Sequence, residues 1–312
     1  MKKNYLTEAQ KNKYDEFFTR REDIEKELQY YVNELKNKTI YCNCDNPYNS
    51  AFWEYFHKNF EKLQLKKLIA TSLGCSYKAE YSGGNDDDIS VFTKTQLSGN
   101  GDFKSKECID FLIYNTDIII TNPPFSLFRA FIDVLMQYNK QFLIIGNVNA
   151  ITYKNFYPYL MQNKIWIGCT NFNCGMYFYV PSDFVYKSTY KFLKEINGRQ
   201  INRVASCCWF TNLIYDKDIP FLPLSAHYAP EKYYKYENFE AINVDKVVDI
   251  PCDYDGIMGV PITFLNKYNP KQFKILGVHN GLDGKKLVYI KNNEKIEPYC
   301  RILIQKRSDV NE

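Results

Sequence analysis

The 312-residue sequence has few histidines and no pair of cysteines at the spacing of a zinc site. Its three histidines are scattered, and its ten cysteines include a CxC at Cys42 and Cys44 and the adjacent Cys207 and Cys208, but no CxxC. Structural zinc sites combine cysteines and histidines at short, regular spacings. The sequence therefore predicts no metal site.

Long apolar runs are also absent. No segment approaches the roughly 18 apolar residues that a membrane span needs. The first twenty residues carry many charged side chains, unlike a signal peptide. Cysteines in a chain without export signals are typical of reduced thiols. We therefore expect a cytoplasmic protein that does not associate with a membrane.

Charge of one sign is not in strong excess. The formal net charge is +4, which permits nucleic-acid binding without indicating it. Hydrophobic residues make up 45% and charged residues 24%, which excludes wholesale disorder, collagen and coiled coil. The aromatic content of 17% fits a base-stacking surface or an AT-rich genome, and both explanations stay open. The length allows one large α/β domain, or a catalytic domain with a smaller one.

Short apolar strands alternate with amphipathic helices from residue 39 onward. Ser50 and Ser126 are the expected N-caps of two of these helices. This alternation with short loops predicts an α/β fold built on a doubly wound parallel sheet. Strands are expected at 39–44, 67–70, 117–121, 141–148 and 165–168, and helices at 50–65, 105–114, 127–135 and 153–163.

The pattern changes beyond residue 171. Short aromatic strands follow at 176–180 and 207–214, then a Pro-bearing irregular segment at 220–256 and small antiparallel strands near the end. We therefore expect a first domain at 1–215 and a second region at 216–312, with the boundary between about 183 and 220.

The most specific feature is Asn122-Pro123-Pro124-Phe125, which follows a buried strand and precedes a helix. Ligands of open α/β sheets bind at the carboxyl ends of the strands. An adenine amine is a poor nucleophile because its lone pair is delocalised into the ring. Acceptors on its two N–H groups return the lone pair to the nitrogen.

The predicted acceptors are the side-chain oxygen of Asn122 and the main-chain carbonyl of Pro123, because the paired prolines hold the backbone rigid. Phe125 would stack on a base removed from the duplex. The alternative is that Asn-Pro-Pro only ends a strand.

Several segments in one order resemble the EcoRI family of adenine-specific DNA methyltransferases. The similarity extends over nearly the whole chain. The segments are Asp15-Glu16-Phe17 with Thr19, Tyr41–Asp45, Gly101-Asp102-Phe103, Thr121–Ser126, Asn147–Asn149 with Ile151–Lys154, Trp209–Asn212 and Gly256–Leu265.

The resemblance implies a Rossmann-like methyltransferase domain that binds S-adenosylmethionine. Phe17 and Thr19 match the motif that holds the methionine end of this cofactor, and Asp45 lies in the turn where the family binds the same moiety. Asp102 and Phe103 match the motif that contacts its adenine ring; a carboxylate accepts from an exocyclic amine, and an aromatic ring stacks on a purine.

The order of motifs resembles the gamma class of amino-methyltransferases, in which a DNA-recognition region follows the catalytic motif. The implied reaction is methylation of the N6 amine of a flipped adenine in double-stranded DNA, with no stable protein partner. Its implied context is a type II restriction-modification system.

Two features depart from the usual methyltransferase pattern. Residues 45–50, after the first strand, contain no glycine, and residues 70–72, after the second strand, contain hydroxyls but no acid for the cofactor ribose. Two other functions stay open: methylation of RNA guanine or of protein glutamine, and DNA binding without catalysis. Basic residues at 191, 194, 199, 203, 285 and 286 are candidate DNA contacts or solvated surface.

Overall fold

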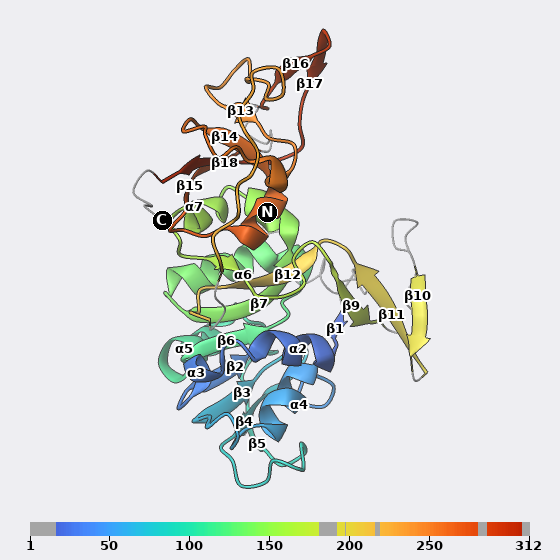
Figure 1. Cartoon of the computed structure of the whole chain (residues 1–312). Coiled ribbons are helices and arrows are strands. Elements are labelled where there is room, and N and C mark those ends of the chain that lie inside the picture. The colour runs from blue at the N-terminus through green and yellow to red at the C-terminus, as the bar shows by residue number, and fades with distance from the viewer. Residues whose placement is uncertain (1–16, 181–191, 197, 216–218, 280–285, 308–312) are drawn as a thin grey trace, which may run out of the picture. The chain divides into compact units, whose positions relative to one another are not determined.

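The structure is a computed structural model that describes residues 17–180, 192–196, 198–215, 219–279 and 286–307. These residues form two compact units (Figure 1). The first unit lies within residues 1–148 and 165–216, and the second within 149–164 and 217–312. The chain therefore leaves the first unit after residue 148, returns at 165 and leaves again after 216.

Four parallel strands form the centre of the large sheet in the first unit. They are β2 (Thr39–Cys42), β3 (Lys67–Ala70), β6 (Ile118–Thr121) and β7 (Gln141–Asn147). Their spatial order is β3, β2, β6, β7. Each is a short apolar run that is almost entirely buried, as expected of a parallel strand covered on both faces.

Both edges of this sheet are antiparallel. β4 (Tyr77–Tyr81) pairs antiparallel with β3 and with β5 (Thr93–Gln96). At the other edge, β12 (Cys207–Thr211) lies between β7 and β8 (Trp166–Ile167), antiparallel to both. The expected parallel arrangement therefore holds for the four central strands but not for the edges, because an apolar run indicates a buried strand but not its direction.

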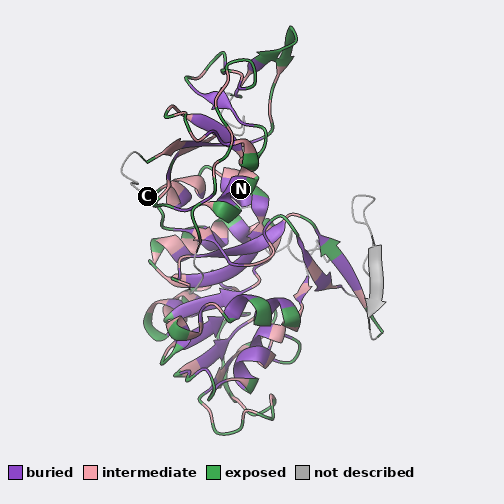
Figure 2. Ribbon diagram, viewed as in Figure 1, coloured by how far each residue is buried: buried purple, intermediate pink, exposed green. Residues whose placement is uncertain are grey.

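Helices cover both faces of the large sheet, whose strands are largely buried (Figure 2). They are α2 (Arg21–Leu28), α3 (Val32–Leu35), α4 (Ala51–Lys58), α5 (Lys106–Asn115) and α6 (Phe128–Gln137). On one face, Trp53 of α4 shares a core with Ile118 and Leu143. On the other, the ring of Phe128 of α6 lies 5.8 Å from that of Phe210 of β12. The first unit is therefore an α/β fold, as predicted.

One of the two predicted helix caps is confirmed. Ser50 is the N-cap of α4, and its Oγ accepts from the backbone N–H groups of Phe52 and Trp53. The predicted cap at Ser126 is wrong, because Phe125–Leu127 form a 3-10 turn, η1, and α6 begins at Phe128 without a side-chain cap. The N–H of Leu127 donates to the carbonyl of Pro124 and forms this turn, so the α-helix begins later than predicted.

A smaller antiparallel sheet joins the N-terminal segment to residues far along the chain. Phe178 lies opposite Thr19 on one side and opposite Asn202 on the other. Directly opposed residues share a face of a sheet. These three side chains therefore point to the same side, and all three are buried. The strands, in spatial order, are β1 (Phe18–Thr19), β9 (Met176–Tyr179), β11 (Arg199–Val204) and β10 (Phe192–Ile196).

The second unit contains a four-stranded sheet and a separate hairpin. The sheet consists of β13 (Ile242–Asn243), β14 (Met258–Pro261), β18 (Arg301–Lys306) and β15 (Phe273–His279), and the hairpin of β16 (Tyr289–Lys291) and β17 (Glu294–Ile296). Its helical segments are α7 (Tyr157–Met161), η3 (Val247–Asp249) and η4 (Ile262–Lys267), while η2 (Val148–Thr152) begins at the end of the first unit.

None of the helices in the described part of the chain combines the length and the hydrophobicity that a transmembrane segment requires.

Candidate active site

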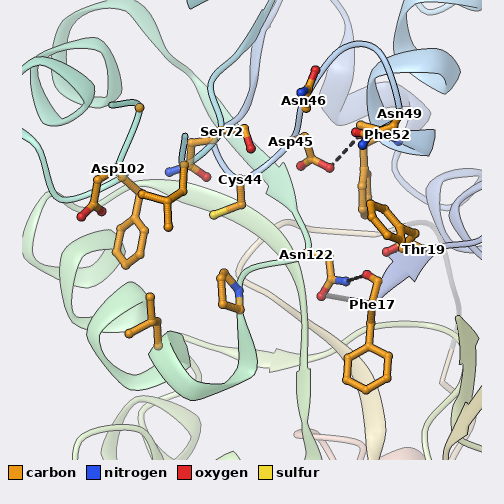
Figure 3. Close-up of a pocket in the computed structure, with 18 of the residues that line it drawn as sticks. Phe17, Thr19, Cys44, Asp45, Asn46, Asn49, Phe52, Ser72, Asp102 and Asn122 are labelled. Carbon is orange, nitrogen blue, oxygen red and sulfur yellow. Dashed lines mark hydrogen bonds between the residues drawn. The ribbon is translucent and has the colours of Figure 1, made fainter. Parts of the chain in front are cut away.

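A cavity of about 350 Å³ opens at the carboxyl ends of β2, β3 and β6 (Figure 3). Its walls come from β1, from the turns that follow these three strands and from the turn before α5. This is the edge at which open α/β sheets bind ligands, and the volume suits a small molecule. Seven predicted site residues line it: Phe17, Thr19, Asp45, Asp102, Phe103, Asn122 and Pro124.

The turn after β2 holds a buried carboxylate. Asp45 accepts hydrogen bonds from the hydroxyl of Ser50 at 2.7 Å and from that of Thr121 at 2.5 Å. Burial raises the pKa of Asp45 to about 6, although both hydroxyls act in the opposite direction. Because Ser50 also caps α4 and Thr121 immediately precedes Asn122, this carboxylate connects the first turn to the Asn-Pro-Pro-Phe segment.

The turn before α5 comes close to the end of β3 through a glycine. Gly101 has a φ of +75°, and a Cβ at this position would lie 2.2 Å from the carbonyl oxygen of Ser72. The next residue, Asp102, accepts from the backbone N–H of Lys104 at 3.0 Å, and the buried ring of Phe103 packs 5.0 Å from that of Phe131. Only glycine can bring this turn so close to β3.

The Asn122 side chain is fixed by the N-terminal segment. Its Nδ2 donates to the main-chain carbonyl of Phe17 at 2.8 Å (Figure 3). Its Oδ1 is buried and has no hydrogen-bond partner among the residues that the structure describes. The amide therefore presents an unoccupied acceptor at the cavity that Asn122 lines.

Pro123 and Phe125 are not among the residues that line the cavity. The ring of Phe125 stacks on that of Phe17, with centroids 5.6 Å apart, and meets that of Phe178 edge-on at 6.2 Å. Phe17 and Phe178 also pack against each other at 5.4 Å. The structure therefore unites Asn122 with the predicted cofactor residues and places Phe125 in a three-ring cluster beside them.

Sequence reasoning missed several residues of this site. Asn43 and Ser72 line the cavity. Phe178 belongs to a strand that the sequence predicted and contributes to the ring cluster. No local sequence pattern indicates that this strand pairs with β1. The hydroxyl of Thr71 is already bonded to that of Tyr41 at 2.7 Å, so Ser72 is the hydroxyl residue of this turn that reaches the cavity.

The predicted basic clusters are only partly visible. Positions 191 and 285 lie outside the described residues, and the side chain at 194 is not described. Arg199 is exposed, with its guanidinium 4.3 Å from the ring centre of Tyr179. Arg203 donates to the carbonyl of Cys174, and Lys286 pairs with Glu297 at 2.7 Å.

These features are those of an amino-methyltransferase. The sheet is mixed with helices on both faces, a cavity opens at the strand ends, and the Asn-Pro-Pro-Phe segment carries an unbonded amide oxygen there. The model of the family described as "Adenine-specific methyltransferase EcoRI" matches residues 5–309. The chain belongs to this EcoRI family of adenine-specific DNA methyltransferases.

Curated relatives agree with this assignment. The Type II methyltransferase M.EcoRI of Escherichia coli is 44% identical over 325 residues, covering 97% of this chain and 96% of that protein. M.MgeORF184P of Mycoplasma genitalium is 44% identical over 276 residues, or 88% of this chain and 86% of that protein. M.MpnI of Mycoplasma pneumoniae is 39% identical over 280 residues, or 88% and 85%. No solved structure matches the chain significantly.

Proposed function

We propose that the protein transfers a methyl group from S-adenosylmethionine to the N6 amine of a flipped adenine in double-stranded DNA. The observation that carries this proposal is the buried Oδ1 of Asn122, which lacks a partner while its Nδ2 is held by Phe17. Since the relatives are named Type II methyltransferases, we place the protein in a type II restriction-modification system. Its place of action is the cytoplasm.

The donors and acceptors of the cavity fit S-adenosylmethionine. Thr19 Oγ1 and Asn43 Oδ1 are buried without partners in the described part of the chain, as expected of atoms that a ligand satisfies. The Asp45 carboxylate suits the cationic methionine end, and Asp102 and Phe103 suit the purine. Ser72 takes the place of the ribose-binding acid that the sequence lacks. When bound, the cofactor supplies an electrophilic methyl group on its sulfonium.

The acceptors of Asn122 and Pro123 activate the amine. The Oδ1 of Asn122 accepts a hydrogen bond from one N6–H group, and the carbonyl of Pro123 accepts one from the other. Because these acceptors are held in place before the reaction, they stabilise positive charge as it develops on N6 without reorganising. Pro124 fixes the backbone that carries them.

The three-ring cluster supplies the stacking surface for the base. In the described structure the ring of Phe125 is in contact with Phe17 and Phe178, so a base enters only when these rings separate. An adenine between Phe125 and a second ring regains the stacking that it loses on leaving the duplex. Flipping costs a few kcal/mol.

Residues 216–312 are proposed to recognise the DNA sequence, while residues 1–215 bind the cofactor and carry out transfer. Exposed cations such as Arg199 would contact phosphates. DNA affinity should then fall steeply as the salt concentration rises.

The decisive experiment incubates the pure protein with methyl-labelled cofactor and, separately, genomic DNA, transfer RNA and total protein. Label is expected in DNA alone. Label only in RNA or protein would instead support methylation of guanine or glutamine, and no transfer with intact DNA binding would identify a non-catalytic relative. Sequencing of DNA from expressing cells, with detection of modified bases, then identifies the methylated atom and its sequence context.

A further inference from the structure

Asn202 of β11 is fully buried, with 0% of its surface exposed, and among the described residues neither its Nδ2 nor its Oδ1 has a hydrogen-bond partner. Buried amides in folded proteins are almost always hydrogen-bonded, because burial removes their hydrogen bonds to water and leaving these unreplaced is costly. Leucine has nearly the same shape and would not carry this penalty. An unbonded amide at such a position therefore indicates that a ligand supplies its hydrogen bonds.

The register of the smaller sheet directs Asn202 toward the active site. It lies opposite Phe178, which in turn lies opposite Thr19, so the three side chains form one row on one face. Phe178 packs on Phe125 and Phe17, and the carbonyl of Phe17 holds Asn122. Asn202 thus lies beside the ring cluster into which we place the flipped base, on the opposite side of Phe178 from Thr19.

The chemistry of the amide selects the ligand. A carboxamide offers a donor and an acceptor side by side, and adenine offers the complementary pair, its N6–H beside a ring-nitrogen acceptor. On the N7 side, guanine carries two acceptors, O6 and N7, and does not match; its N1 side, with the O6 acceptor beside the N1–H donor, matches only an amide in the reversed orientation.

We infer that Asn202 contacts the flipped adenine and contributes to the choice of base. Its Nδ2 donates to N1 or N7, and its Oδ1 faces the N6 hydrogen on that side, together with the Pro123 carbonyl. The inference rests on the proposed function, since it requires an adenine among the rings.

The test compares Asn202→Ala and Asn202→Leu with the wild type on duplexes that carry the recognition sequence. The target adenine is kept, or replaced by 1-deazaadenine or 7-deazaadenine, each of which lacks one ring-nitrogen acceptor. Both variants should lose on the order of 10- to 100-fold in kcat/KM on adenine. One deaza analogue should slow the wild type by a similar factor and slow the variants little further, because the lost partners are the same.

The stability of Asn202→Leu separates a ligand-binding role from a structural one. Without ligands this variant should unfold at the same temperature as the wild type or higher, because no bond is lost. Asn212→Ala is the matched control: Asn212 bonds the backbone of Phe142 and Lys140, so its loss should lower stability without altering base preference.

Two outcomes would overturn the inference: unchanged kcat/KM in both Asn202 variants, or variants that discriminate against the deaza analogues as strongly as the wild type does. Failure of the proposed function is distinct, because the wild type itself would then transfer no methyl group to any duplex.

Discussion

Replacement of Asp45 by Asn should make the free protein more stable and the cofactor complex weaker. The carboxylate is buried, and its partners in the described structure are the hydroxyls of Ser50 and Thr121. Asn keeps one acceptor for Ser50, and the hydroxyl of Thr121 can turn to accept from the new NH₂ group. The substitution therefore removes a buried charge and retains the hydrogen-bond connections.

The magnitude follows from the pKa of Asp45, which burial raises from 3.8 to about 6. Such a shift corresponds to about 3 kcal/mol of destabilisation when the group is fully ionised. The folded state binds more protons than the unfolded state between these two pKa values, so the wild type loses stability as pH rises through this window. Above it, Asp45→Asn should be more stable by about 1–3 kcal/mol, allowing for imperfect hydrogen bonds.

The assay is urea unfolding of both proteins without cofactor, at several pH values from about 8 down to about 5. The stability gap should narrow as the pH falls. Calorimetry at the higher pH should show S-adenosylmethionine bound on the order of 10- to 100-fold more weakly by the variant. A variant less stable than the wild type at high pH, or a gap that widens on acidification, would refute the assignment of Asp45 as a charge retained for the ligand.

Three further substitutions test the site and the fold that surrounds it. Asn122→Ala should lower kcat on the order of 100-fold or more with a small effect on DNA affinity, and unchanged single-turnover transfer would remove Asn122 from the mechanism. Gly101→Ala should lower the free energy of unfolding by about 3 kcal/mol, because its Cβ meets the carbonyl of Ser72. Gly74→Ala is the control: Gly74 has a φ of +88° and open space around it, so this variant should lose only about 1 kcal/mol. Equal losses of stability in thermal unfolding would contradict the proposed clash. Glu27→Gln should lower the free energy of unfolding by about 2 kcal/mol in urea. Burial raises the pKa of Glu27, as it does that of Asp45, but each Glu27 oxygen accepts from a backbone N–H, that of Cys169 or Thr170, so the new NH₂ group would face a donor that cannot turn. An unchanged midpoint would show that these bonds contribute nothing.

Local signals predicted the parts of the site that lie within one turn of the chain. An apolar run ending at Asn122, a serine before an amphipathic helix and a Gly-Asp-Phe turn each specify a local geometry. Because the carboxyl ends of parallel strands meet at one edge, these turns could be expected to converge. The shared cavity confirms that Asp45, Asp102 and Asn122 converge there.

Non-local pairing could not be predicted in the same way. Thr19 and Asn202 both pair with residues of β9, and neither segment carries a pattern that specifies its partner or register. The antiparallel direction of β12 likewise has no local signal in the sequence. The sequence predicts that Phe125 stacks on a base, but its contacts with Phe17 and Phe178 depend on the smaller sheet and could not be predicted.

Several unsatisfied polar groups of the first unit lower the stability of the free protein and should be satisfied when ligands bind. Thr19 Oγ1, Asn43 Oδ1, Asn122 Oδ1 and the Asn202 amide are buried and find no partner among the described residues, and each such group costs about 1–3 kcal/mol in the free protein. Ligands that bond these atoms remove the cost, so the free energy of binding also stabilises the fold. Cofactor should therefore raise the unfolding temperature, and duplex DNA should raise it further. If DNA added no stabilisation beyond that of cofactor, Asn202 would have to be satisfied in some way other than by the base.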